Sequence, residues 1–73
     1  MKVKVGYYTV VTAVIDVDDK FSVLTPVACE NPSLAEENLL LDLYDIGWET
    51  VLQNGGDELL FVDFVDGGHL IEV

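Results

Sequence analysis

Apolar and polar residues alternate along the first part of the chain and change to a helical period further on. From residue 3 to residue 17 the odd positions are almost all apolar, which predicts one long β-strand, bent at Gly6. A turn follows, and residues 21–29 then read as a second strand with its apolar residues on one face. Pro26 cannot donate a hydrogen bond to a sheet, so it places this strand at an edge or breaks it there. The two segments predict an antiparallel hairpin.

The clearest local signal is a helix start just after Pro32. Ser33, followed three residues later by Glu36, has the spacing of a capping box, in which each residue bonds the backbone N–H of the other. The apolar period then predicts a helix over 34–45, ended by Gly47 as a C-terminal cap. On a helical wheel the core side of this helix holds its large apolar residues, namely Leu39, Leu40, Leu43, Tyr44 and Ile46.

Turn residues divide the rest of the chain into short strands. Residues 48–53 are expected to form a third strand, followed by an Asn54-Gly55 hairpin turn. Residues 58–65 are apolar on both faces except for one aspartate, so this fourth strand should be central, and 69–73 form a last strand. The predicted fold class is therefore α+β in a single domain over 1–73. Its ββαβββ order gives a mostly antiparallel sheet with one helix packed on one face.

The charge of the chain is strongly unbalanced. Its 73 residues include 14 Asp or Glu against three lysines and no arginine, for a net charge of −11. The lysines are Lys2, Lys4 and Lys20, whereas acidic residues continue to the end of the chain. An apolar content of 51% predicts a folded domain and not a disordered acidic tail. Such a charge repels nucleic acid and anionic membranes. It serves either recognition of a basic partner or general solubility, as in an acid-rich proteome.

The residue types required for catalysis are sparse. One histidine and one cysteine, with no arginine and no phosphate-binding glycine loop, predict that the protein is not an enzyme and has no cofactor. Cys29 reads as a buried free thiol, and His69 as a surface or edge-strand residue. The segment from Asp16 to Asp19 resembles the start of a calcium loop, but it lacks the glycine and glutamate required further on. We therefore expect no dedicated metal site.

The predicted helix has an unusual outer face. Glu37, Asn38, Asp42 and Asp45 lie opposite the core, and Leu34 and Leu41 project among them. Leu41 is either at the edge of the core or an apolar anchor at the centre of a charged interface. The residues expected to bind a partner are the acids of this face and of the later turns together with that leucine, namely Glu37, Leu41, Asp42, Asp45, Glu49, Asp57, Glu58, Asp63 and Asp66.

In size, acid excess and expected fold, the chain resembles the small acidic DNA-mimic inhibitors. This class includes phage anti-restriction proteins, anti-CRISPR proteins and uracil-DNA glycosylase inhibitors. The resemblance rests on no aligned motif, so it transfers no residue. It implies an inhibitor whose fixed carboxylates imitate the phosphates of DNA or RNA and occupy the basic surface of a nucleic-acid-binding protein.

The expected partner is thus a basic nucleic-acid-binding protein or complex, without direct binding to nucleic acid or membrane. The alternative is a structural or adaptor module that self-associates as a homodimer, or joins a complex, through a sheet edge. The N-terminal segment has no continuous apolar run of the length of a signal peptide or membrane span, which favours a cytoplasmic location, the host cytoplasm for a viral protein.

Overall fold

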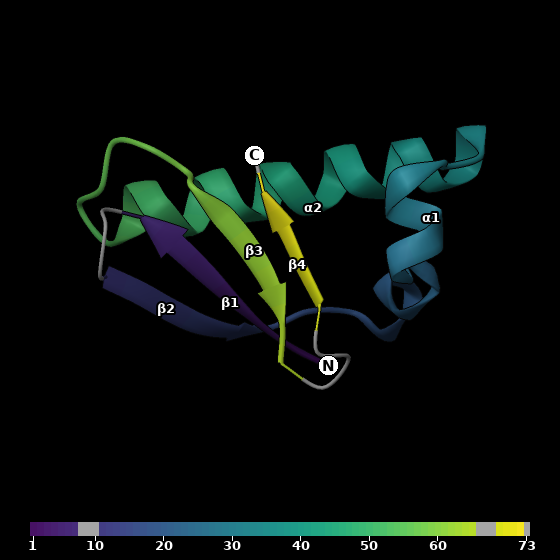
Figure 1. Cartoon of the computed structure of the whole chain (residues 1–73). Helices are drawn as coiled ribbons and strands as arrows, with labels where there is room; N and C mark the ends of the chain where they lie inside the picture. The colour runs from purple at the N-terminus through teal and green to yellow at the C-terminus, as the bar shows by residue number, and fades with distance from the viewer. Residues whose placement is uncertain (8–10, 66–68, 73) are drawn as a thin grey trace.

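A computed structural model describes residues 1–7, 11–65 and 69–72, with Val11 and 69–72 described as backbone only. The chain is α+β, as predicted, and Figure 1 shows its main helix lying along one side of an antiparallel sheet. The elements in chain order are β1 (Lys2–Tyr7), β2 (Val11–Asp16), the 3-10 helix η1 (Asp19–Val23), α1 (Pro26–Glu30), α2 (Leu34–Gln53), β3 (Phe61–Phe64) and β4 (His69–Glu72). The predicted ββαβββ order is only partly correct, because two helices stand where two of the strands were expected.

The sheet has the strand order β2-β1-β3-β4, and all of its neighbouring strands are antiparallel. Strand β1 pairs with β2, from Lys2 opposite Asp16 to Tyr7 opposite Val11. On its other side β1 pairs with β3, with Val5 opposite Val62. Strand β3 therefore lies inside the sheet, as its apolar pattern predicted, and β2 and β4 are the edges (Figure 1).

The single long strand predicted over 3–17 is wrong, because the chain reverses within it to form β1 and β2. The pairing places odd-numbered residues opposite odd-numbered residues. The apolar alternation therefore stays in phase on both sides of the reversal. Val3 and Val5 are buried on the same face on which Ala13 and Ile15 are half-buried. A period of two could not distinguish this hairpin from one continuous strand.

The strand predicted over 21–29 is also wrong, since η1 and α1 occupy this segment. Pro26 is the first residue of α1, where its missing N–H costs no hydrogen bond. The Thr25 hydroxyl caps the helix by accepting a bond from the Ala28 N–H at 3.2 Å. Cys29 is consequently helical and only half-buried, with its Sγ 3.7 Å from the Leu24 carbonyl oxygen.

Helix α2 begins as predicted. The Ser33 Oγ accepts from the Glu36 N–H at 3.3 Å, and the Glu36 carboxylate accepts from the Ser33 N–H at 2.8 Å, which completes the capping box. The hydrogen bond from the Ser33 backbone N–H to the carboxylate, and secondarily the Ser33 side chain, lower the pKa of Glu36 below its ordinary value of 4.5. Local sequence signals were sufficient at this end of the helix.

The predicted end of the helix at Gly47 and the strand over 48–53 are wrong, because α2 continues to Gln53. Gly47 is buried inside the helix, and a Cβ on it would lie 3.1 Å from a Leu59 methyl carbon. The glycine thus permits close packing of α2 and does not end the helix. The helix ends at Asn54, and Gly55 follows with a φ of 76°, so this pair forms a helix cap and not a hairpin turn.

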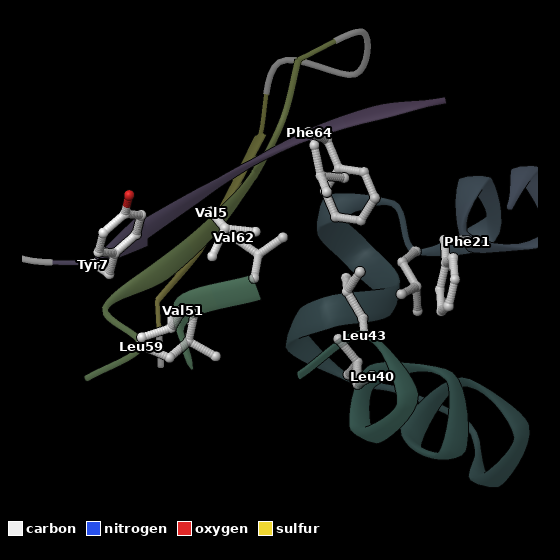
Figure 2. Close-up of a cluster of buried hydrophobic side chains, with 11 residues drawn as sticks. Val5, Tyr7, Phe21, Leu40, Leu43, Val51, Leu59, Val62 and Phe64 are labelled. Carbon is white, nitrogen blue, oxygen red and sulfur yellow. The ribbon is translucent and has the colours of Figure 1, made fainter. Parts of the chain in front are cut away.

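The core lies between α2 and one face of the sheet. Leu40, Leu43 and Val51 of α2 are buried together with Val5, Val62 and Phe64 of the strands, and Figure 2 shows both groups in one apolar cluster. Phe21 and Leu24 extend the cluster beyond the end of the sheet. The core side predicted for the first part of the helix is confirmed, with Leu39, Tyr44 and Ile46 half-buried at its margins.

Two leucines of α2 provide a matched test of this orientation. Leu43→Ala should lower the free energy of unfolding by about 2–5 kcal/mol, because it leaves a cavity in the core. Leu41→Ala, the same substitution on the exposed face, should change it by less than about 0.5 kcal/mol. Urea denaturation followed by circular dichroism measures both values, and equal losses would contradict the assigned face.

The capping box should make stability depend on pH. Because the pKa of Glu36 is lowered in the folded state, its contribution is present above pH 4.5 and is lost as the pH falls through the folded-state pKa. Glu36→Gln should therefore flatten the loss of stability below pH 4.5, measured by urea denaturation at several pH values. Glu37→Gln removes the same charge one residue away, leaves the capping box intact, and should follow the wild-type curve more closely. Coincident curves for the two variants would contradict the prediction.

Candidate functional site

The outer face of α2 carries a row of exposed apolar side chains at helical spacing. Leu34, Leu41, Trp48 and Leu52 are 74%, 60%, 40% and 66% exposed. Their spacings of seven, seven and four residues place them on one side of the helix, opposite the buried Leu43. We call these four residues the apolar stripe. The prediction that Leu41 projects into solvent is confirmed, and its placement at the core edge is wrong.

Carboxylates flank the apolar stripe. At 100° per residue, the exposed Asp42, Asp45 and Glu49 follow one edge of the stripe, and the exposed Glu37 lies on the other edge. Along the helix axis, Asp42 and Asp45 are separated by a rise of about 4.5 Å, and Asp45 and Glu49 by a rise of about 6 Å. We call Asp42, Asp45 and Glu49 the acidic column. The outer face of α2 therefore combines apolar surface with a row of negative charge.

A shallow groove lies beside the acidic column. It has a volume of about 430 Å³ and separates α2 from the segment that follows β2. Four aspartates line it, two from each side, and its apolar lining comes from one residue of α2 and two of the other wall. The lining residues are Asp16, Val17, Asp18, Lys20, Phe21, Asp42, Asp45 and Ile46. The fold thus brings acids from distant parts of the sequence to one depression.

The positive charges lie near the beginning of the chain and neutralise little of the α2 surface. The Lys2 ammonium lies 3.2 Å from an Asp16 carboxylate oxygen. The Met1 ammonium lies 2.9 Å from Asp19. The Lys20 ammonium lies 5.2 Å from the centroid of the Phe21 ring. Among the residues that the structure describes, no ion pair involves an acid of α2.

The structure brings together five of the nine predicted partner-binding residues. Glu37, Leu41 and the acidic column share the outer face of α2. Asp57 and Glu58 are exposed in the connection between α2 and β3, beyond the end of the helix. Asp63 alternates with the buried Val62 and Phe64 of β3, so it lies half-buried on the sheet face away from α2. Asp66 lies outside the described residues.

Sequence reasoning missed part of this surface. Trp48 and Leu52 belong to the apolar stripe, but they were assigned to a strand, so their helical spacing from Leu41 was not considered. Continuing the helical wheel past Gly47 would have found them. Asp16 and Asp18 were considered only as part of a segment that resembles a calcium loop. Nothing local to either segment indicates their position across the groove from Asp42.

The ionisable groups with shifted pKa values lie near the start of α2 and outside the groove. Burial, and secondarily the negative charge of Glu36, raises the pKa of the Cys29 thiol. Burial, and secondarily the charge of Cys29, raises the pKa of Tyr44. Both groups are therefore held in their neutral, protonated forms at neutral pH, in which a thiol is a weak nucleophile.

The described part of the chain offers neither a metal site nor a membrane-spanning helix. Its His, Cys, Asp and Glu side chains include no group of three or more placed to hold a metal ion. None of its helices is long and apolar enough to cross a membrane. The chain matches no protein-family model, no curated protein and no solved structure. The outer face of α2 and the groove beside it are therefore the candidate functional site.

Neutralising two carboxylates of the groove should stabilise the fold. Asp42→Asn with Asp45→Asn should raise the free energy of unfolding by about 0.2–1 kcal/mol in low salt, because the four aspartates repel one another. The gain should shrink in 0.5 M NaCl, about threefold above a physiological ionic strength, because salt screens exposed charges. Asp57→Asn with Glu58→Gln removes equal charge outside the groove and should give a smaller gain. Urea denaturation measures each value, and a net loss of stability would contradict the prediction.

Proposed function

We propose that this protein binds a basic, nucleic-acid-binding surface of another protein through the outer face of α2, and that it prevents nucleic acid from binding there. The observation that carries the proposal is the apolar stripe lying alongside the acidic column. A helix that packs on a sheet usually has a polar outer face, whereas both sides of this one are rich in leucine. An exposed row of large apolar side chains between charges is typical of a protein-binding surface.

The two components of the surface have different roles in binding. The stripe supplies apolar contact area, with Trp48 and Leu41 at its centre as the expected anchors. The carboxylates steer a positively charged partner and set the register of the contact. Their spacing along the helix, about 4.5 and 6 Å, is of the same order as the spacing of charge along a nucleic-acid strand, about 3.4 Å of axis per phosphate. A basic surface that binds phosphates can therefore accept this helix.

The net charge of −11 determines which partners are favoured. A second copy of the chain bound through the apolar stripe would bring two acidic columns together, which like-charge repulsion opposes. Nucleic acid is repelled for the same reason. The alternative of an adaptor joined through a sheet edge would use β2 or β4, because β3 is an interior strand with neighbours on both sides. A basic protein surface fits both the charge and the exposed leucines.

Capture of the partner at different salt concentrations tests the proposal. The immobilised protein should retain a nucleic-acid-binding protein from a lysate of its native cells at about 50 mM salt and release most of it at about 500 mM, because added salt screens the charges. Duplex DNA or RNA should elute the same protein and should not bind to the immobilised chain itself. Retention that is insensitive to both salt and nucleic acid would contradict the proposal and favour an adaptor.

Variants of the retained complex locate the surface. Asp42→Lys with Asp45→Lys should weaken binding on the order of 100-fold, and Leu41→Ala about tenfold. Asp57→Lys with Glu58→Lys makes an equal change in net charge beyond the helix and should have a much smaller effect. Calorimetry with the purified partner measures each affinity. Equal losses for the two charge reversals would show that only net charge matters and would contradict a specific surface on α2.

A further inference from the structure

The groove has the features of a site for one cationic side chain. Its two walls carry aspartates, Asp42 and Asp45 on α2 and Asp16 and Asp18 on the opposite side. Between them the lining is apolar, formed by Val17, Phe21 and Ile46. Carboxylates on either side of an apolar strip suit a long side chain that ends in a positive charge, because the stem contacts apolar surface and the charged end contacts the acids.

One cation of the chain itself already uses this groove. Lys20 lines it, and its ammonium lies 5.2 Å from the centroid of the Phe21 ring. The backbone N–H of Lys20 also donates a hydrogen bond to the Asp18 carboxylate at 2.8 Å. This bond orients Asp18 at the groove wall. The side chain is exposed and is bound to no carboxylate by a described ion pair, so it can move away at little cost. Phe21 is only 1% exposed with Lys20 in place, so another cation can reach its ring only where Lys20 leaves it.

We infer that the groove binds an arginine side chain of the partner protein, and that Lys20 competes with that arginine for the Phe21 ring. This inference rests on the proposed function and names the group that the partner contributes. A guanidinium suits the groove better than an ammonium. It is less strongly hydrated, it stacks on an aromatic face, and its five N–H donors can bind more than one carboxylate.

The competition has a direct consequence for affinity. An arginine that enters the groove must displace the Lys20 ammonium from Phe21 and overcome its repulsion. Removing the Lys20 charge should therefore tighten the binding of a guanidinium. The gain should exceed the gain from removing one positive charge elsewhere on the protein. Lys4 supplies the control, because it lies in the middle of β1 and does not line the groove. Lys4→Gln changes the net charge by the same amount as Lys20→Gln.

A titration followed by NMR tests the inference without the partner. N-acetyl-arginine amide, added to the ¹⁵N-labelled protein at constant ionic strength, should shift the amide signals of Asp16–Phe21 and Asp42–Ile46 along saturating curves. Lys20→Gln should bind it about two- to fivefold more tightly than Lys4→Gln does, the range that corresponds to a surface cation–π contact. N-acetyl-lysine amide should bind at least about twofold more weakly than the arginine probe, because it cannot form a bidentate contact.

Paired neutral variants complete the test. Asp42→Asn with Asp45→Asn should abolish saturable binding of the arginine probe, whereas Asp57→Asn with Glu58→Gln should retain it. The inference is overturned if the shifts spread over all acidic surfaces, or if Lys20→Gln and Lys4→Gln bind equally well. Those results would leave the proposed function standing, because it is tested separately with the captured partner. Conversely, specific probe binding with no salt-sensitive partner would overturn the proposed function alone.

Discussion

The structure depends on the burial of the inner face of α2 against the sheet. A helix of 20 residues is about 30 Å long, and so it spans the longest dimension of the molecule, 33 Å. Leu40, Leu43 and Val51 form one side of the core over this length, and β1 and β3 form the other. Gly47 at the middle of the contact allows the helix to approach Leu59 closely. This packing fixes the rotation of α2, and so it also determines which residues point into solvent.

The same rotation exposes a surface that folding alone does not explain. A chain of 73 residues has a small margin of stability, and clustered carboxylates reduce it by repulsion. The described acids of α2 form no ion pair that would offset that cost, and the leucines beside them gain nothing from exposure. A surface of this kind is understandable if another molecule covers it. In the proposed function, the apolar stripe supplies contact area and the carboxylates select a basic partner.

Tertiary structure also distinguishes among the acids. Composition treats all 14 alike, whereas the fold sorts them into separate groups. Asp42 and Asp45 belong both to the outer face of α2 and to the wall of the groove, so they connect the two parts of the candidate surface. Asp63 is in register with Lys4 on β1 and lies on the other side of the sheet. Five of the predicted residues, Glu37, Leu41, Asp42, Asp45 and Glu49, therefore share one surface, and Asp63 lies apart from it.

The sequence by itself determined what depends on neighbours along the chain. The capping box at Ser33, the core side of α2 up to Ile46, the α+β class and the interior position of β3 all follow from local bonding or periodicity. Tertiary structure decided what local signals leave open. The apolar alternation of residues 3–17 is the same for one long strand and for a hairpin in which odd residues pair with odd residues. Likewise, the weak helix propensity of Gly47 is outweighed by its packing on Leu59. The groove arises only when the end of β2 is folded beside α2, because contacts between distant segments leave no periodic trace in the sequence.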